Sequence, residues 1–138
     1  MTKGFEELRV WQLAHALALE VYRISDAFPI EEKYASTSQI RRAASSVAAN
    51  IAEGYGRHSR AEYLHFLHYS RGSLMEAKSY LYLARDLGYL TATQAGTIMD
   101  AIRDLGVRLN NTISALSRPP TKHNEQLSND DRKTIEPQ

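Results

Sequence analysis

Apolar residues recur every three or four positions through most of the chain, in four long stretches separated by short polar segments. In the first stretch the apolar stripe runs through Val10, Leu17 and Ile24. This period matches the turn of an α-helix, and no segment carries the strict alternation of a half-buried β-strand. The pattern therefore predicts four helices, at about residues 6–27, 36–53, 60–87 and 92–117.

Residues that start and stop helices stand between these stretches. Pro29 ends the first stretch, because the residue before a proline disfavours the helical conformation. A Ser or Thr followed three positions later by Gln or Glu forms a capping box, in which each side chain satisfies a free backbone N–H group. Such boxes stand at the starts of the last three helices, at Ser36–Gln39, Ser59–Glu62 and Thr91–Gln94. Gly54 and Gly88 are expected to end the second and third helices in the left-handed conformation.

The connections between the predicted helices are short, which favours an all-α, antiparallel up-down four-helix bundle over residues 1–118. The first helix has a wide apolar face, and the third would be roughly 40 Å long at 1.5 Å per residue. Both features exceed what a small bundle needs for its own core, so we expect the chain to form a homo-oligomer. Residues 119–138 are polar and lack any period, and they predict a disordered tail.

Composition excludes several kinds of chemistry. The chain of 138 residues contains no cysteine, so disulfides, thiolate metal sites and cysteine nucleophiles are excluded. It has no N-terminal signal core and no apolar run of the ~20 residues that a membrane span needs. These features favour a cytoplasmic protein with no membrane partner.

No catalytic apparatus is apparent. Gly54 and Gly56 follow a helix rather than a strand, so the dinucleotide-binding fingerprint does not apply. Glu62 and His65 have the spacing used by di-iron bundles, but those sites need this pair on two helices and the pair occurs once. The sequence therefore predicts no enzyme activity, no catalytic residue, no metal site and no cofactor.

The centre of the sequence carries a family resemblance. Residues 38–44 read Ser-Gln-Ile-Arg-Arg-Ala-Ala, and residues 50–57 read Asn-Ile-Ala-Glu-Gly-Tyr-Gly-Arg. Further matching segments are Phe5-Glu6-Glu7-Leu8, Val10-Trp11, Gly72-Ser73-Leu74 and Leu87-Gly88-Tyr89-Leu90. Over about residues 4–118 the chain resembles the S23-like four-helix bundle proteins encoded by intervening sequences inside bacterial 23S rRNA genes.

This resemblance implies a homopentamer of bundles arranged as a barrel around a central pore. It also implies kinship with the accessory variability determinant of diversity-generating retroelements, a pentameric relative that binds a reverse transcriptase and nucleic acid. For most members of the family no activity is established, so the resemblance implies a fold more directly than a function.

Positive charge is concentrated in the middle of the chain. Between residues 41 and 85 there are seven Lys and Arg against three Glu, a local balance of +4 in a chain whose net charge is only +1. An oligomer would multiply this field and attract a polyanion such as RNA or DNA. The candidate nucleic-acid-binding residues are Arg41, Arg42, Arg57, Arg60, Arg71 and Lys78. The alternative is that these cations are solvated or pair with acids of neighbouring helices.

Two further expectations concern the same region. Arg41 and Arg42 point about 100° apart on a helix, so one is expected near a helix boundary beside an acid and the other toward water or a ligand. Residues Asn50, Glu53, Gly54 and Gly56 are predicted to form a structural turn between the second and third helices. The two hypotheses for function are an oligomer that binds RNA or DNA, and a scaffold that binds a polymerase-like or ribosomal protein without touching nucleic acid.

Overall fold

The computed structural model describes residues 4–118, and this part of the chain contains four α-helices and no strand. Two short 3₁₀ helices, Phe5–Glu7 and Ile30–Glu32, flank the first of them. The α-helices are α1 (Arg9–Ser25), α2 (Ser36–Tyr55), α3 (Arg60–Asp86) and α4 (Ala92–Ser117). The all-α fold and its four helices are thus confirmed, whereas the predicted tail, residues 119–138, lies outside the described residues.

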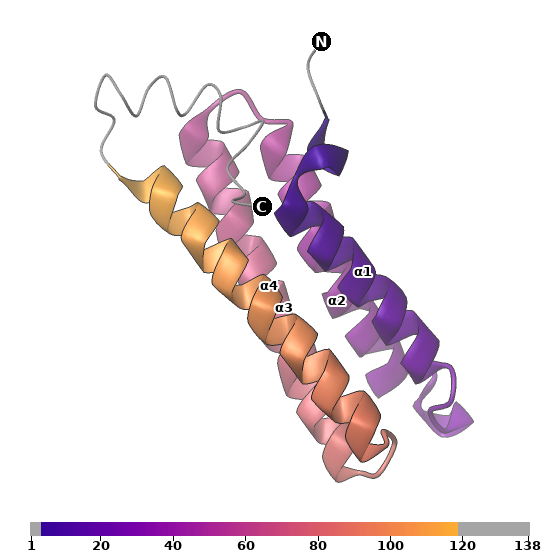
Figure 1. Ribbon diagram of the computed structural model, residues 1–138. Helices are drawn as coiled ribbons and strands as arrows, with labels where there is room; N and C mark the ends of the chain where they lie inside the picture. Colours follow the sequence, from indigo (N-terminus) through magenta and orange to yellow (C-terminus); the bar gives the residue numbers. More distant parts are fainter. Residues whose placement is uncertain (1–3, 119–138) are drawn as a thin grey trace.

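Each helix contacts the next one along the chain, and α1 also contacts α4, so that the four helices enclose a common core (Figure 1). The α1–α2 and α3–α4 connections lie at the same end, where the Tyr89 hydroxyl donates a hydrogen bond of 3.2 Å to Glu32. At the other end the start of α3 is bound to the end of α4, through Arg60 and the carbonyl of Leu116.

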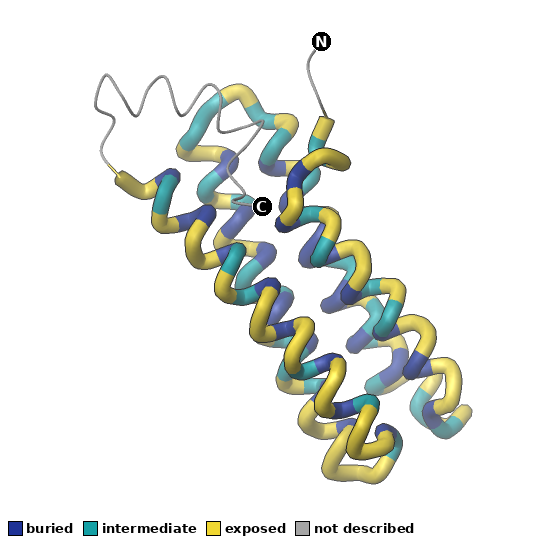
Figure 2. The backbone as a smooth tube through the Cα atoms, in the orientation of Figure 1, coloured by how far each residue is buried: buried dark blue, intermediate teal, exposed yellow. Residues whose placement is uncertain are grey.

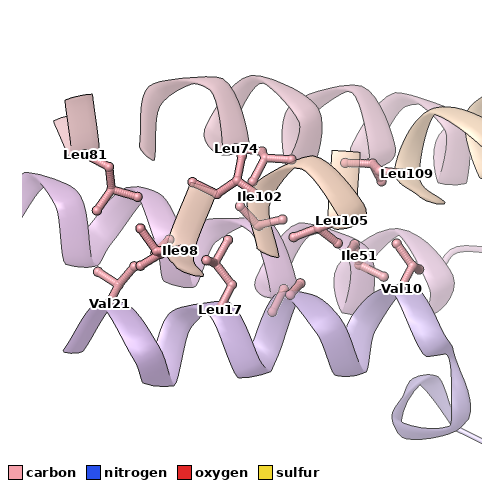
Figure 3. Close-up of a cluster of buried hydrophobic side chains, with 14 of the residues drawn as sticks. Val10, Leu17, Val21, Ile51, Leu74, Leu81, Ile98, Ile102, Leu105 and Leu109 are labelled. Carbon is pink, nitrogen blue, oxygen red and sulfur yellow. The ribbon is translucent and has the colours of Figure 1, made fainter. Parts of the chain in front are cut away.

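The core is built from the inward stripes of all four helices, and the outer faces are exposed (Figure 2). In α4 the apolar positions that recur every three or four residues are buried, and Ile98, Leu105 and Leu109 are fully inaccessible to solvent. Figure 3 shows Ile98 between Val21 and Leu17 of α1, within one continuous cluster of buried side chains. Apolar burial on this scale is the main term that stabilises such a fold.

The helix ends differ from the sequence-based prediction in an informative way. The Thr91–Gln94 capping box is present in full, and the Ser59 hydroxyl accepts from the backbone N–H of Glu62, so these two starts are confirmed. The first α-helix is shorter than predicted, because a 3₁₀ turn occupies residues 5–7 and α1 spans only Arg9–Ser25.

The predicted capping box at Ser36 is wrong. Ser36 is the first residue of α2 itself, and Ala35 stands at the N-cap without a side-chain cap. Glu32, in the preceding 3₁₀ turn, caps the helix instead. Its carboxylate accepts hydrogen bonds from the backbone N–H (3.4 Å) and the hydroxyl (2.8 Å) of Ser36. An upstream carboxylate competes successfully here because an ionised acceptor binds N–H groups at a helix N-terminus more strongly than a neutral one.

The expectation that Gly54 adopts a left-handed turn is also wrong. Among the described residues only Gly88 has a positive φ, 79°, which confirms the predicted turn after α3. Gly54 lies inside the last turn of α2 and is buried. A Cβ at this position would lie 2.6 Å from Cβ of Phe66 and 3.1 Å from Cδ1 of Tyr63, both on α3. Glycine is required at this position because α3 passes too close for any side chain.

Acid pH is expected to weaken the Glu32 contacts. Hydrogen bonds from the side chain and backbone of Ser36, and then from Tyr89, lower the pKa of Glu32 below its usual value of 4.5. A carboxyl whose pKa is lowered by folding contributes stability above its unfolded pKa and loses that contribution as the pH falls through its folded pKa. In urea unfolding from pH 7 to pH 3, Glu32→Gln should therefore be less stable than the unmodified chain at pH 7. The difference in free energy of unfolding between the two proteins should become smaller below about pH 4.5.

The matched control is Glu31→Gln, which changes an exposed side chain one position earlier on the same turn. This variant should follow the unmodified chain over the whole pH range. A stability difference for Glu32→Gln that stays constant from pH 7 to pH 3 would contradict the role assigned to the carboxylate.

Candidate nucleic-acid interface

The two neighbouring arginines of α2 diverge, and Arg41 turns toward α1. Its Nε donates to the Ser25 hydroxyl at 2.8 Å and its Nη2 to the Tyr22 carbonyl at 3.3 Å. The guanidinium lies over the Tyr22 ring, with Cζ 4.9 Å from the ring centroid, and Asp26 approaches to 4.0 Å. Because the last carbonyls of a helix lack intrahelical partners, Arg41 serves to close the C-terminus of α1.

Arg42 turns the other way, toward α3 and solvent. It forms an ion pair with Glu76 and donates to the Gln39 side chain at 3.0 Å. More than half of its side chain remains exposed. An exposed pair of this kind adds little to stability, so Arg42 can exchange its partner for a phosphate at small cost.

Arg57 lies in the α2–α3 connection and Arg60 is the first residue of α3, and both make contacts within the chain. Arg57 pairs with Glu53 at 2.6 Å and lies over the Phe66 ring at 4.9 Å. Arg60 donates to the carbonyl of Leu116, in the last turn of α4, and to that of Arg118, just beyond the helix. Arg60 therefore closes α4 in the same way as Arg41 closes α1.

Three cations of α3 form a row on its surface. Arg71, Lys78 and Arg85 are spaced seven residues apart, so they lie on one face and succeed each other at roughly 10 Å. We call these three residues the basic row. Arg71 donates to the Asn110 side chain of α4 at 3.3 Å, which turns the row toward the α3–α4 side of the bundle.

Tyr82 lies within this row. Arg85 Cζ lies 4.7 Å from the Tyr82 ring centroid and Lys78 Nζ lies 6.0 Å from it. The hydrogen bond from Arg85 to the Asp86 carboxylate, at 2.9 Å, raises the pKa of the guanidinium further. The row thus combines permanent positive charge with a partly exposed aromatic ring, the two features with which proteins bind the backbone and bases of a strand.

The predicted structural turn is only partly right. Asn50, Glu53 and Gly54 belong to α2, and only Gly56 lies beyond its end. The Asn50 amide donates back to the Ser46 carbonyl at 2.9 Å and to the Ser46 hydroxyl at 3.0 Å. Ser46 in turn lies 2.9 Å from the Ser73 hydroxyl of α3. Asn50 therefore orders the α2–α3 contact along the helix rather than the corner.

Sequence reasoning missed a group of residues at the α1–α2 connection. Lys33, Tyr34 and Thr37 surround two hollows together with Tyr22 and Arg41. The one available signal was Thr37, a hydroxyl-bearing residue three positions before Ile40 on the buried face of α2.

Within residues 4–118, no three His, Asp or Glu side chains lie close enough together to hold a metal ion. No helix in this range combines the length and the hydropathy required to cross a membrane. The Glu62–His65 spacing noted in the sequence therefore finds no further ligands among the described residues.

Comparison with known proteins identifies a similar solved structure and a family. A crystal structure of a protein of unknown function from the S23 ribosomal protein family, from Bacteroides thetaiotaomicron VPI-5482, superposes with a TM-score of 0.72 at 23% identity. The match covers 78% of this chain and 97% of that one. A search of curated proteins found no match. The family model of the 23S rRNA-intervening sequence protein matches residues 6–111, which is most of the chain. The chain therefore belongs to the 23S rRNA-intervening sequence protein family.

Proposed function

We propose that this chain is a non-enzymatic, cytoplasmic protein that binds RNA or DNA through the basic surface of α2 and α3. In this proposal antiparallel up-down bundles assemble as a homopentamer, which repeats that surface five times. The observation that carries the proposal is the basic row, three cations at intervals of seven residues along one face of a long helix.

The contacts of the candidate cations refine where a strand would bind. Arg41 and Arg60 bind the ends of α1 and α4. A phosphate would have to compete with the Ser25 hydroxyl and the Tyr22 carbonyl for Arg41, and with the Leu116 carbonyl for Arg60. Arg71 contacts the Asn110 amide of α4 and Lys78 lies over the Tyr82 ring, so neither of these contacts is with an acid. We therefore centre the interface on Arg71 and Lys78, with Arg42 at its edge.

Phosphate contacts predict a steep dependence on salt. The logarithm of the association constant should fall linearly with the logarithm of salt concentration, with a slope of about −0.7 to −0.9 per phosphate neutralised. Arg71→Gln and Lys78→Gln should each reduce the slope by about 1 and weaken binding to unrelated sequences alike. Fluorescence anisotropy with labelled RNA and DNA over 50–300 mM salt, a range chosen around roughly physiological conditions, provides the measurement.

Arg23→Gln is the matched control. It removes the same charge from an exposed arginine on α1, whose partner is Glu20 of the same helix. If Arg23→Gln reduces the slope as much as Arg71→Gln does, binding follows total charge and the interface is misplaced. Absence of binding to either polymer at the lowest salt would remove the proposal altogether.

The second candidate function, a protein-interaction scaffold, is favoured by exposed apolar side chains. Leu19 on α1, Met75 and Leu83 on α3 and Val107 on α4 are each between 47% and 60% exposed. Apolar groups spread over three helices are suited to contact with other proteins, including copies of this chain. Binding of a polymerase-like protein by a variant that has lost all affinity for RNA and DNA would favour this reading.

Assembly is expected whichever function holds. Light scattering coupled to size exclusion should give a mass of five times 15.6 kDa, stable on dilution to micromolar concentration. The physical reason is that the apolar groups on α1, α3 and α4 leave water when the copies associate. A single species of monomer mass at micromolar concentration would contradict the assembly.

A further inference from the structure

The connection between α1 and α2 leaves two adjoining hollows at one end of the bundle. The smaller, of about 240 Å³, lies between the end of α1 and the start of α2, and the larger, of about 480 Å³, extends over the first turns of α2. Lys33, Thr37 and Arg41 line both hollows. The larger hollow falls within the range of about 300–1,000 Å³ that is usual for small-molecule sites.

Thr37 presents a polar atom that the protein itself leaves unsatisfied. The residue is only 7% exposed, and its hydroxyl oxygen is buried without a hydrogen-bond partner in the described structure. A buried hydroxyl that lacks a partner lowers stability, so such groups are rare and call for a specific reason. A ligand atom that bonds to this hydroxyl would supply the reason.

Positive charge predominates among the side chains around the hollows. Lys33, Arg41 and Arg42 line them, and the single acid is Asp26, whose side chain is 92% exposed. Arg41 uses Nε and Nη2 for its contacts with α1, and its guanidinium carries two further N–H donors on Nη1. Glu32, on the same connection, is engaged by Ser36 and Tyr89.

The start of α2 adds to this positive field. Its N-cap residue, Ala35, supplies no side-chain cap, the Glu32 carboxylate accepts the backbone N–H of Ser36, and Thr37 lies in the first turn of the helix. Helix N-termini favour anions because their first N–H groups lack intrahelical acceptors. The helix start, the buried hydroxyl and the cations therefore favour the same kind of ligand, an anion with several acceptor oxygens.

Two tyrosines indicate that the anion also carries an aromatic group. Tyr22 and Tyr34 both line the larger hollow, and Tyr34 is 87% exposed. Arg41 lies over the Tyr22 ring, and Lys33 Nζ lies 5.4 Å from the centroid of the Tyr34 ring. Exposed aromatic rings beside cations bind nucleobases by stacking while the cations hold the phosphate.

We propose that the α1–α2 corner binds a nucleoside monophosphate group, with the phosphate among Lys33, Thr37 and Arg41 and the base against Tyr34. The group is either a free mononucleotide or the 5′-phosphorylated end of a strand. None of the residues that line the two hollows belongs to the basic row on α3. The nucleotide site can therefore be tested independently of binding along a polymer.

Isothermal titration of the full chain with AMP tests the site directly. AMP is expected to bind, adenosine to bind at least tenfold more weakly, and inorganic phosphate to bind more weakly than AMP. A short oligoribonucleotide with and without a 5′-phosphate separates the two sources. Binding that needs the 5′-phosphate identifies a strand end, and binding of AMP alone identifies a free nucleotide. Equal binding of AMP and adenosine, or no binding of AMP or the phosphorylated strand, overturns the proposal.

Two variants test whether Lys33 and Thr37 bind a ligand or only support the α1–α2 connection. Lys33→Gln should weaken AMP binding about tenfold. Thr37→Val keeps the shape of the side chain and removes the unsatisfied hydroxyl, so it should weaken AMP binding about three- to tenfold. In the absence of ligand the same variant should raise the melting temperature. A Thr37→Val protein with unchanged AMP affinity, or with a lowered melting temperature, contradicts the role of the hydroxyl.

Arg71→Gln is the control that separates this site from the basic row. It should leave AMP affinity unchanged while it weakens binding along RNA or DNA. If Arg71→Gln abolishes AMP binding, the nucleotide lies on α3 and the assignment to the corner is wrong.

Discussion

Replacing Gly54 with alanine is expected to destabilise the bundle by about 3 kcal/mol, near the upper end of what overpacking costs. The new Cβ would lie 2.6 Å from Cβ of Phe66, an atom fixed to the α3 backbone, and 3.2 Å from the Tyr63 carbonyl. Neither neighbour is the end of a flexible side chain, so α2 and α3 would have to move apart. Urea unfolding, or a fall in melting temperature of roughly 10 °C, measures the effect.

Two other glycines supply the controls. Gly56 has a φ of −77°, and the nearest atom to a Cβ there is the Glu53 carbonyl oxygen at 3.6 Å. Gly72, in the middle of α3, has nothing within 4 Å of that position. Gly56→Ala should be close to neutral, and Gly72→Ala should stabilise by about 0.5–1 kcal/mol through helix propensity. A Gly54→Ala variant as stable as these two would show that the close approach of α3 is relaxed in solution.

Arg60→Ala is expected to lower the free energy of unfolding by about 2 kcal/mol, although Arg60 looks from the sequence like a surface cation. Its guanidinium donates to the carbonyls of Leu116 and Arg118 and so joins the start of α3 to the end of α4. Hydrogen bonds from a charged group contribute about 1.5–3 kcal/mol, and a cation at a helix C-terminus also interacts favourably with the macrodipole.

Arg42→Ala is the comparison for Arg60→Ala. The ion pair of Arg42 with Glu76 is largely exposed, so its loss should change stability by no more than about 0.5 kcal/mol. Arg60→Lys retains the charge but loses the planar fork of donors. Its loss of stability should lie between those of Arg60→Ala and Arg42→Ala. If Arg60→Ala unfolds at the same urea concentration as Arg42→Ala, the helix-end contacts contribute nothing and Arg60 returns to the candidate interface.

The parts of the fold that the sequence predicts well are those governed by local signals. The ranges of α3 and α4 agree with the prediction to within one residue, because a long regular stripe and a Ser or Thr cap coincide at each start. The start of α2 shows the limit of such reasoning. The pattern at Ser36 has the form of a capping box. In the structure the Ser36 hydroxyl instead donates to the carboxylate of Glu32, four residues upstream.

Gly54 and the arginines could not be interpreted locally, because their roles depend on a second helix. A glycine near a helix end suits both a left-handed turn and a close helix contact, and only the position of Phe66 decides between them. Similarly, charge counts identify cations but not their partners. Arg41 and Arg60 close helix ends across the bundle, and each group that accepts from them lies at least sixteen residues away in sequence.

The hydroxyl contacts between α2 and α3 fix how the two helices can move. Ser70 donates to the Val47 carbonyl at 2.8 Å, and Ser46 and Ser73 meet at 2.9 Å one turn further along. A sliding step of one helical turn would break both contacts and drive the Phe66 region against the last turn of α2. The two contacts therefore favour a single register for the α2–α3 hairpin. We expect a rearrangement on assembly or ligand binding to take place where α1 and α4 meet this hairpin, because α2 and α3 share the most extensive contact.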